Sequence, residues 1–301
     1  MFRLFNLIAI LFLFNISRVS AQTDSLKQKI QQVLSTKKAT VGIAIMGSNG
    51  KDSLSINGNM HSPMQSVFKF HIAIAVLSEI DKGKFFLDQK IKIEKKDMLQ
   101  DLHSPLRKKY PNGGDIAISE ILKYTVSESD NAGCDILLRL IGGPKLVEDY
   151  FAKNNFKDIS IKINEEVQQR NWDRQFENWT TPKAANEVLM QFYNNKTKLL
   201  SKKSYNFLWK IMKETSTGKA RIKGQLPANT VVAHKTGSSG ANKEGLTAAV
   251  NDIGIVFLPN GNYFYISVFV TNSTENSDTN EKIISDISKI TWDYFINKKI
   301  N

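Results

Sequence analysis

The chain has 301 residues, one cysteine and a formal net charge of +12. A single cysteine excludes an intrachain disulfide, and the length suffices for one large domain or two interwoven lobes with a substantial core. Only seven of the 41 basic residues are arginine, and the lysines are scattered along the whole chain. We therefore expect no nucleic-acid partner and interpret the charge as a solvated, lysine-rich surface.

The first 21 residues have the pattern of a secretory signal peptide. Arg3 precedes a nearly continuous apolar run, Leu4–Phe14, which is too short for a transmembrane span. Val19-Ser20-Ala21 then provides residues suited to cleavage after Ala21. We predict a cleaved signal peptide, a periplasmic location and no membrane attachment of the mature chain; an uncleaved anchor is the alternative.

The spacing at which apolar residues recur changes twice along the chain. A helix over Leu26–Leu34 is followed by strands over Val41–Met46 and near Ser53–Ile56. From about residue 62 the pattern becomes mostly helical, with Ser62-Pro63 predicted to cap a helix that runs to Lys82. The later predicted helices are Ile116–Tyr124, Ala132–Ile141, Pro144–Lys153, Pro182–Tyr193 and Lys203–Met212.

Strands return near the end of the chain. They are predicted over Val231–Lys235, Leu246–Phe257 and Tyr263–Val270, before a last amphipathic helix over about Asn280–Asn297. The order predicts an α+β fold: an antiparallel five-stranded sheet flanked by the terminal helices, with an inserted all-helical lobe. Residues 22–61 and 213–301 would form the sheet lobe, residues 62–212 the helical lobe, and the active site would lie between them.

Ser66 and Lys69 are three residues apart in a predicted first helical turn, so the hydroxyl and the ammonium can meet. Serine needs an adjacent base to act as a nucleophile, and a partly desolvated lysine can serve. The Ser-x-x-Lys pattern alone carries little weight, because it recurs by chance in lysine-rich chains.

Two further motifs add weight. Ser129-Asp130-Asn131 precedes a predicted helix, and Lys235-Thr236-Gly237 ends a predicted strand. Taken singly, the first is also a plausible N-cap cluster and the second a plausible strand end. Together, in this order and at separations of 63 and 106 residues, they resemble the penicillin-recognising serine enzymes, class A β-lactamases in particular. The residues around these motifs resemble most those of the VEB and PER extended-spectrum group.

The resemblance implies a role for each matching position. Ser66 would attack the lactam carbonyl, Lys69 would assist proton removal and hold Asn131, and Ser129 would relay a proton to the leaving nitrogen. Asn131 would bind the substrate's acylamide side chain. The substrate carboxylate would be bound by Lys235, Thr236 and Ser238, beside Gly237. The backbone N–H groups of Ser66 and Ser238 would form the oxyanion hole, whereas Asp130 would be structural.

A loop over about residues 160–182 would supply the base for hydrolysis of the acyl-serine. Aligning Asn164-Glu165-Glu166-Val167-Gln168-Gln169 on the family's Glu-x-x-x-Asn spacing makes Glu165 the base and Gln169 its partner. Glu166 is the alternative base. Gln168 and Gln169 replace the family's usual leucine and asparagine, which predicts an unusual path for the loop.

Two other positions are candidates for substrate binding. His103 occupies the place where the family usually has an aromatic wall, although it is equally compatible with an ordinary loop histidine. The strand after Lys-Thr-Gly lacks the arginine common in class A enzymes, and Arg221 is the best substitute, or else a surface arginine. Asn251-Asp252 on that strand is interpreted as a bend.

We predict a monomeric β-lactam hydrolase that confers antibiotic resistance and uses no metal or cofactor, since the four histidines show no ligand spacing. The rivals are a cell-wall D,D-peptidase and a β-lactam-sensing binding domain. The D,D-peptidase reading is distinguished by Glu165, because such an enzyme deacylates β-lactams slowly. Cys134 is expected to be buried and inert.

Overall fold

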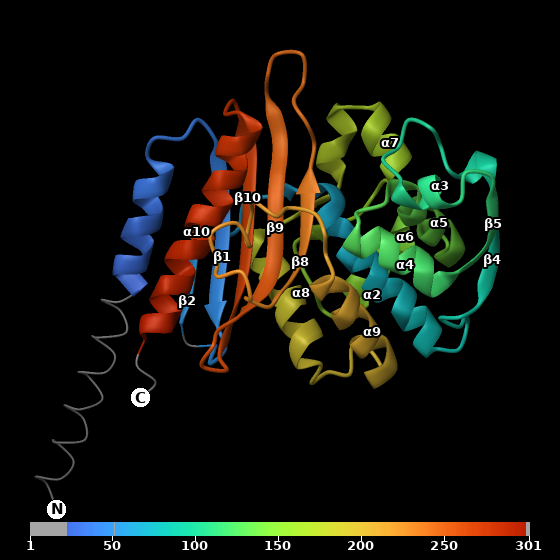
Figure 1. Cartoon of the computed structure of the whole chain (residues 1–301), viewed down its shortest axis with the longest axis horizontal. Helices are drawn as coiled ribbons and strands as arrows, with labels where there is room; N and C mark the ends of the chain where they lie inside the picture. Colours follow the sequence, from blue (N-terminus) through green and yellow to red (C-terminus); the bar gives the residue numbers. More distant parts are fainter. Residues whose placement is uncertain (1–22, 51, 299–301) are drawn as a thin grey trace, which may run out of the picture.

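The computed structural model describes residues 23–50 and 52–298, and the predicted signal peptide lies outside the described residues. A five-stranded antiparallel sheet of order β2-β1-β10-β9-β8 runs through the molecule (Figure 1). Its strands are β1 Thr40–Gly47, β2 Ser53–Ile56, β8 Val232–Ser238, β9 Thr247–Phe257 and β10 Tyr263–Ser273. The predicted α+β fold with this sheet is confirmed.

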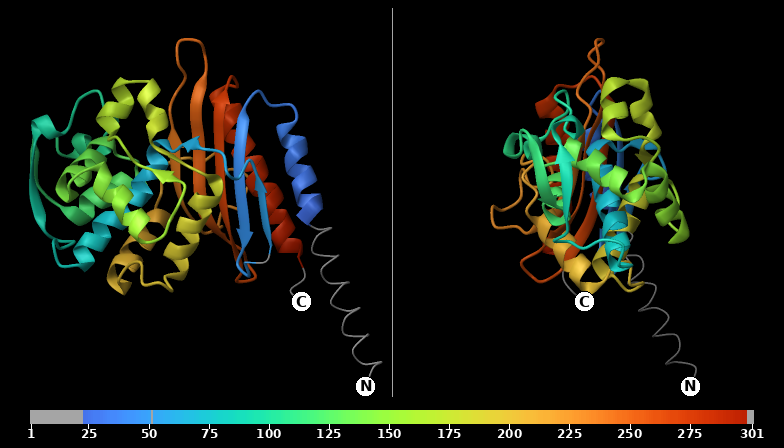
Figure 2. Two further views of the ribbon diagram at one scale, coloured as in Figure 1. Left: turned by 180° about the vertical axis from the view of Figure 1, so that it is seen from behind. Right: turned by 90° about the vertical axis from the view of Figure 1, so that its right-hand side faces the viewer.

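Helices cover both faces of the sheet (Figure 2). The first helix, residues 23–34, and α10, Ser277–Asn297, lie side by side on one face, and α8, Pro182–Asn194, packs against β1 and β10 on the other. Neighbouring residues of a strand point to opposite faces. Val268 therefore joins the core under the terminal helices, whereas Phe269 joins the core of the helical lobe.

The helical lobe is built around α2, Phe68–Asp81, which is buried on nearly all sides. An apolar surface all round is typical of a central helix. The other helices of the lobe are α3 Pro105–Lys109, α4 Ile118–Ser127, α5 Asn131–Ile141, α6 Pro144–Lys153, α7 Glu165–Arg170 and α9 Lys202–Lys213, with short 3₁₀ turns η2 Lys95–Asp97 and η3 Asp173–Glu177.

The lobe is not entirely helical, which corrects one part of the prediction. β4, Lys90–Glu94, pairs with β5, Gly113–Ala117, in a two-stranded sheet at its outer side. Ile116 therefore belongs to a strand, and α4 begins two residues later. The missed signal was the alternation of isoleucine with charged residues in Lys90–Glu94, a pattern too short to outweigh the surrounding helical period.

The start of the α2 region also differs from the prediction. Ser62-Pro63 does not cap a helix; it forms strand β3, which pairs with Trp179-Thr180 of β7. β6, Ile159–Ser160, is the third strand of this small sheet. A 3₁₀ turn, η1, spans Gln65–Val67 before α2 begins at Phe68. Long-range strand pairing thus overrides the local capping signal and places the nucleophile candidate at a strand-to-helix turn.

Within the described residues, no helix combines the length and apolar character that a membrane crossing requires. Cys134 on α5 is fully buried, as predicted, and burial raises the pKa of its thiol well above the usual value. A thiol in such surroundings is inert, because the reactive thiolate is disfavoured.

Candidate active site

Ser66 and Lys69 meet at the junction of η1 and α2. Lys69 Nζ lies 2.9 Å from Ser66 Oγ, and the lysine is fully buried whereas the serine is half-buried. The strand-to-helix turn therefore leaves the serine partly accessible and keeps the ammonium buried beside it. An ammonium held against a serine hydroxyl can stabilise the developing alkoxide and exchange protons with it.

The second motif is held against the first. Lys69 Nζ also donates to the backbone oxygen of Ser129 at 2.8 Å and to Asn131 Oδ1 at 2.5 Å. Asp130 lies between these residues, fully buried, and accepts bonds from Gly133 N and Leu106 N at 2.6 Å each. Asp130 is thus the N-cap of α5 and ties its loop, as expected from the sequence.

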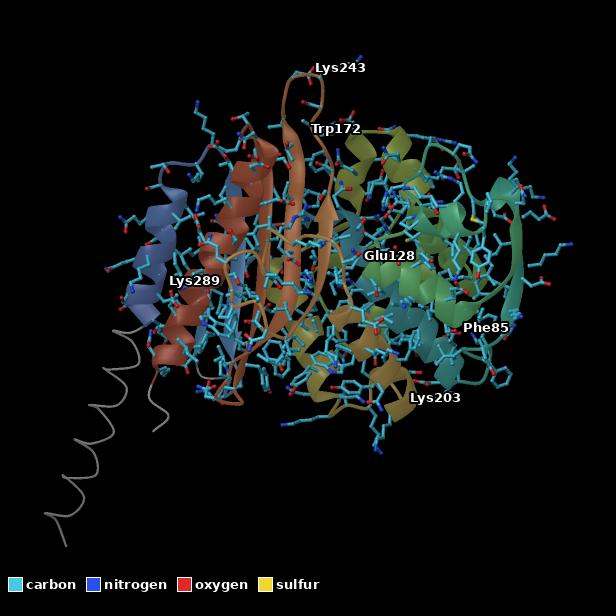
Figure 3. All side chains as sticks on the ribbon, in the orientation of Figure 1. Phe85, Glu128, Trp172, Lys203, Lys243 and Lys289 are labelled. Atoms are coloured by element: carbon cyan, nitrogen blue, oxygen red, sulfur yellow. The ribbon has the colours of Figure 1, made fainter. Side chains whose placement is uncertain are left out.

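The third motif completes the cluster from the sheet side. Lys235, fully buried in the middle of β8, donates from Nζ to Ser129 Oγ at 2.9 Å. Burial and the nearby Lys69 ammonium lower the pKa of Lys235 well below its usual value. Glu128, the residue before Ser129, lies in the middle of the molecule, where the helices face β8 (Figure 3). The three motifs, distant in sequence, are therefore in direct contact.

Glu165 lies at the N-terminus of α7, 3 % exposed, and reaches the same cluster. Its Oε1 is 2.8 Å from Lys69 Nζ and 3.4 Å from Ser66 Oγ. Glu166 instead turns outward and pairs with Arg170 on the surface. Of the two candidate carboxylates, the structure brings only Glu165 to the serine.

Known proteins resemble this chain along nearly its whole length. The model of the Beta-lactamase enzyme family matches residues 25–295. "Beta-lactamase VEB-1" of Pseudomonas aeruginosa is 56% identical over 292 residues, covering 97% of both chains. The chain belongs to the class A β-lactamases. "Extended-spectrum beta-lactamase PER-1" of Pseudomonas aeruginosa is 42% identical over 288 residues, covering 95% of this chain and 92% of that one.

Solved class A structures share the fold. The TLA-3 extended-spectrum β-lactamase superposes with a TM-score of 0.89 at 51% identity, over 91% of this chain and 100% of that one. A class A β-lactamase from Bacteroides cellulosilyticus superposes with a TM-score of 0.88 at 40% identity. The match covers 92% of this chain and 99% of that one. The resemblance drawn from the three motifs, including the VEB and PER group, is confirmed.

The partner of Glu165 corrects the register expected from other class A β-lactamases. Gln169 is exposed, whereas the neighbouring Gln168 is buried and donates from Nε2 to Glu165 Oε2 at 3.3 Å. α7 begins at Glu165, so the fourth residue of the helix, not the fifth, points back at the Glu165 carboxylate. Gln169 is therefore removed from the predicted site, and Gln168 takes its place.

Arg221 reaches the end of β8 although it belongs to the segment between α9 and β8. Its Nη1 donates to Gly237 O at 3.0 Å and its Nη2 to Ser238 Oγ at 2.6 Å, while Glu281 pairs with Nε at 3.0 Å. The side chain is 7 % exposed. Arg221 is thus no ordinary surface arginine, and its cationic plane lies beside the end of β8.

Several residues that support the site were missed from the sequence. Asp135 on α5 accepts from the backbone N of Glu165 at 2.8 Å and of Glu166 at 3.0 Å. Asn251 lies within continuous β9, not at a bend, and donates to Pro63 O at 2.8 Å. A charged residue inside the apolar stretch of α5 was the available signal for Asp135.

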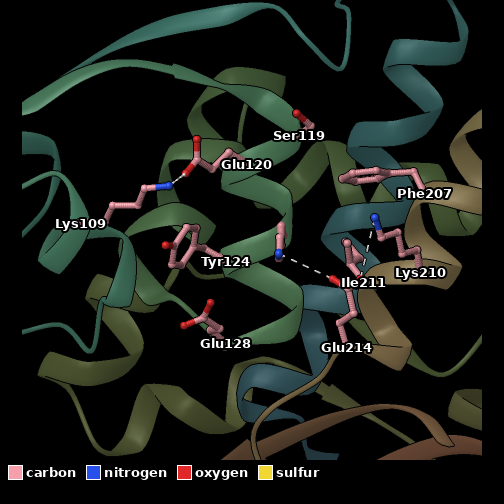
Figure 4. Close-up of a pocket in the computed structure, with 10 residues that line it drawn as sticks. Lys109, Ser119, Glu120, Tyr124, Glu128, Phe207, Lys210, Ile211 and Glu214 are labelled. Atoms are coloured by element: carbon pink, nitrogen blue, oxygen red, sulfur yellow. Dashed lines mark hydrogen bonds and ion pairs between the residues drawn. The ribbon is translucent and has the colours of Figure 1, made fainter. Parts of the chain in front are cut away.

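The remaining predicted positions and pockets lie at the periphery. His103 is exposed; its ring meets Glu128 O at 3.4 Å, and its backbone oxygen accepts from Asn131 N at 2.9 Å. A pocket of about 380 Å³ between α4 and α9 (Figure 4) is lined by surface ion pairs such as Lys109–Glu120 and contains none of the predicted site residues. The described residues contain no group of three or more His, Cys, Asp or Glu able to hold a metal ion.

Proposed function

We propose that this class A β-lactamase hydrolyses penicillins and cephalosporins through an acyl-enzyme on Ser66, and so confers resistance to them. The observation that carries the proposal is the position of Glu165 Oε1, 3.4 Å from Ser66 Oγ and 2.8 Å from Lys69 Nζ. A carboxylate at that place can act on a hydroxyl, and later on a water molecule that attacks the acylated serine.

Acylation would begin with transfer of the Ser66 proton to the Lys69–Glu165 pair while Oγ bonds to the lactam carbonyl carbon. The backbone N–H groups of Ser66 and Ser238 would stabilise the oxyanion, a contribution of roughly 3–4 kcal/mol per donor. The ring C–N bond then breaks, and the nitrogen takes a proton from the Ser129 hydroxyl. The proton that the Lys69–Glu165 pair took from Ser66 replaces it, so the pair and Ser129 regain their starting states before deacylation. Lys235, 2.9 Å from Ser129 Oγ, would stabilise that hydroxyl as it loses the proton.

Deacylation would use Glu165 as the general base. It removes a proton from water as the water oxygen attacks the ester carbonyl, and the Ser66 Oγ–carbon bond breaks as the serine regains a proton. Glu166 is a poor alternative, because its carboxylate is paired with Arg170 outside the cluster.

The end of β8 would bind the substrate carboxylate. Lys235 and Arg221 supply positive charge there, with the Thr236 and Ser238 hydroxyls as donors, and Asn131 would bind the acylamide group. His103, at the exposed edge of the cleft, would flank the substrate side chain. We extend to this chain the extended spectrum named for the PER-1 relative, so an extended range of cephalosporins is among the expected substrates.

We also propose a periplasmic, monomeric enzyme released by cleavage after Ala21, with the sheet lobe formed by residues 22–61 and 213–301 and the helical lobe by residues 62–212. The D,D-peptidase alternative shares the serine, lysine and Lys-Thr-Gly parts of the site. A buried carboxylate beside the serine favours a β-lactam hydrolase over both the peptidase and the sensor, since neither of these needs rapid hydrolysis of a β-lactam acyl-enzyme.

Substitution of the two glutamates tests the assignment of the base. Glu165→Gln should still be acylated by a chromogenic cephalosporin but should lose deacylation by about 10²–10⁴-fold, the usual contribution of a general base. Mass spectrometry of the intact protein should then show an adduct on Ser66. Glu166→Gln is the matched variant; if it traps the adduct while Glu165→Gln turns over normally, Glu165 is not the base.

A further inference from the structure

Four buried amide side chains form a continuous hydrogen-bonded chain behind the base. Gln65, Gln168, Gln175 and Asn178 are 5, 7, 3 and 0 % exposed, and they come from η1, α7, η3 and the residue before β7. Burying an amide is costly unless its donors and acceptors are paired. Four such groups in one place therefore require a structural or functional reason.

Gln168 is the centre of this chain. Its Nε2 donates to Glu165 Oε2 at 3.3 Å and to Gln65 Oε1 at 3.1 Å, so both of its hydrogens are used. Its Oε1 accepts from Asn178 Nδ2 at 3.4 Å. Gln65 in turn donates from Nε2 to Gln175 Oε1 at 2.6 Å. The amide of Gln168 thus links the base to the residue that precedes the nucleophile.

The direction of donation is fixed at both ends. A carboxylate can only accept, so Gln168 must present its NH₂ group to Glu165, and Gln65 must then accept from Gln168 and donate to Gln175. At the other end, Asn178 Oδ1 accepts from the backbone N of Lys162 at 2.8 Å and of Ile163 at 3.1 Å. Its NH₂ group therefore donates, to Ile163 O at 2.9 Å and to Gln168 Oε1, and one set of amide orientations satisfies the whole chain.

We propose that Gln168 is the positioning residue of the deacylation base. It holds Glu165 Oε2 so that Oε1 faces Ser66 and Lys69, and it ties α7 to the nucleophile turn through Gln65. Gln65 has a φ of +47°, a left-handed conformation that is uncommon outside glycine, and its two amide bonds stabilise it. The inference rests on the proposed role of Glu165 and adds the residue that sets its geometry.

Gln168→Met is the direct test, because methionine fills a similar volume without donating a hydrogen bond. Acylation by a chromogenic cephalosporin should fall much less than deacylation, since Lys69 still contacts Ser66 Oγ and can take its proton when Glu165 is displaced. Deacylation should fall by about 10²-fold, the cost of a base displaced by about 1 Å. The adduct should accumulate in the mass spectrum. Gln169→Met is the matched variant of the exposed neighbour and should deacylate at the wild-type rate.

Gln168→Glu gives a second readout that a purely packing role would not change. The new carboxyl keeps the shape of glutamine but stands beside Glu165, in a site that also contains Lys69 and, behind the backbone of Glu165, Asp135. A second negative charge disfavours ionisation of the base, so the acid limb of the deacylation profile should move to higher pH. An unshifted profile in a folded variant contradicts the proposal.

Wild type and Glu165→Gln are measured in parallel. A single stoichiometric burst from the wild type would overturn the proposed function itself. Repeated turnover by the wild type, with deacylation of Gln168→Met within twofold of it, overturns only the positioning role. The same holds if Gln169→Met accumulates the adduct and Gln168→Met does not.

Discussion

Asp135 is a buried side chain that holds the start of the helix carrying Glu165. Its carboxylate accepts the free backbone N–H groups at the start of α7, which the helix itself leaves unpaired. Burial, and secondly the Glu165 carboxylate, raise the pKa of Asp135 from 3.8 to about 7. The helix that carries the base is thus anchored by a group that titrates near neutral pH.

This shift predicts a pH-dependent stability. Between about pH 4 and pH 7 the folded protein holds a proton on Asp135 that the unfolded chain releases, so the unfolding free energy falls as pH rises through that window. Asp135→Asn cannot titrate there. The unfolding free energy of the wild type, relative to that of the variant, should therefore fall by roughly 1–3 kcal/mol between pH 5 and pH 8, since one pKa unit is worth about 1.4 kcal/mol. Urea unfolding at both pH values measures it, and a difference independent of pH would refute this account.

At the scale of elements, the site depends on the close approach of β8 to η1. A Cβ atom on Gly237 would lie 2.5 Å from the backbone oxygen of Met64 and 3.2 Å from the backbone nitrogen of Ser66. Asn251 of β9 holds the same turn by donating to Pro63 O and Met64 O. Glycine at this position therefore lets the strand end stand beside the nucleophile turn.

Gly237→Ala should push these two backbones apart. We expect kcat/KM for a chromogenic cephalosporin to fall by about 10²-fold or more, comparable with the loss of one oxyanion donor. Val231→Ala, at the exposed residue just before β8, is the control and should retain normal kinetics. Normal kinetics in Gly237→Ala, in a folded protein, would mean that the close approach has no catalytic importance.

At the scale of the whole molecule, the sequence predicted the features that depend on patterns extending over many residues. Five strands, the flanking helices and the three contacting motifs follow from hydrophobic period and motif order, and the structure agrees. The sequence did not predict features that arise from contacts distant along the chain. The pairing of Ser62-Pro63 with β7 joins segments far apart in sequence. Likewise, Asp135 of α5 holds the start of α7 at Glu165, and this start makes Gln168, not Gln169, the neighbour of the Glu165 carboxylate.

Contacts between distant segments also explain why the sequence did not predict the residues that support the site. Asp135, Asn251 and Gln65 bond mainly to backbone groups or amides of other elements, so no spacing within one segment identifies them. Asp135 alone had a sequence signal, because it is a charged residue in an apolar helical stretch.

The chemistry proposed for the whole molecule needs no metal ion. Incubation of the purified protein with a chelator should leave kcat/KM for a chromogenic cephalosporin unchanged, because the nucleophile, base and oxyanion donors are all protein groups. A loss of activity that returns on addition of zinc would contradict this prediction.

The most direct test of the central claim is the number of turnovers per active site. The purified mature protein, mixed with an excess of a chromogenic cephalosporin, should hydrolyse many equivalents per active serine, and Ser66→Gly should hydrolyse none. A panel that adds a penicillin and an oxyimino-cephalosporin would define the spectrum. A single stoichiometric burst, with a stable adduct on Ser66, would contradict the account, because Glu165 would then stand beside the serine without freeing it.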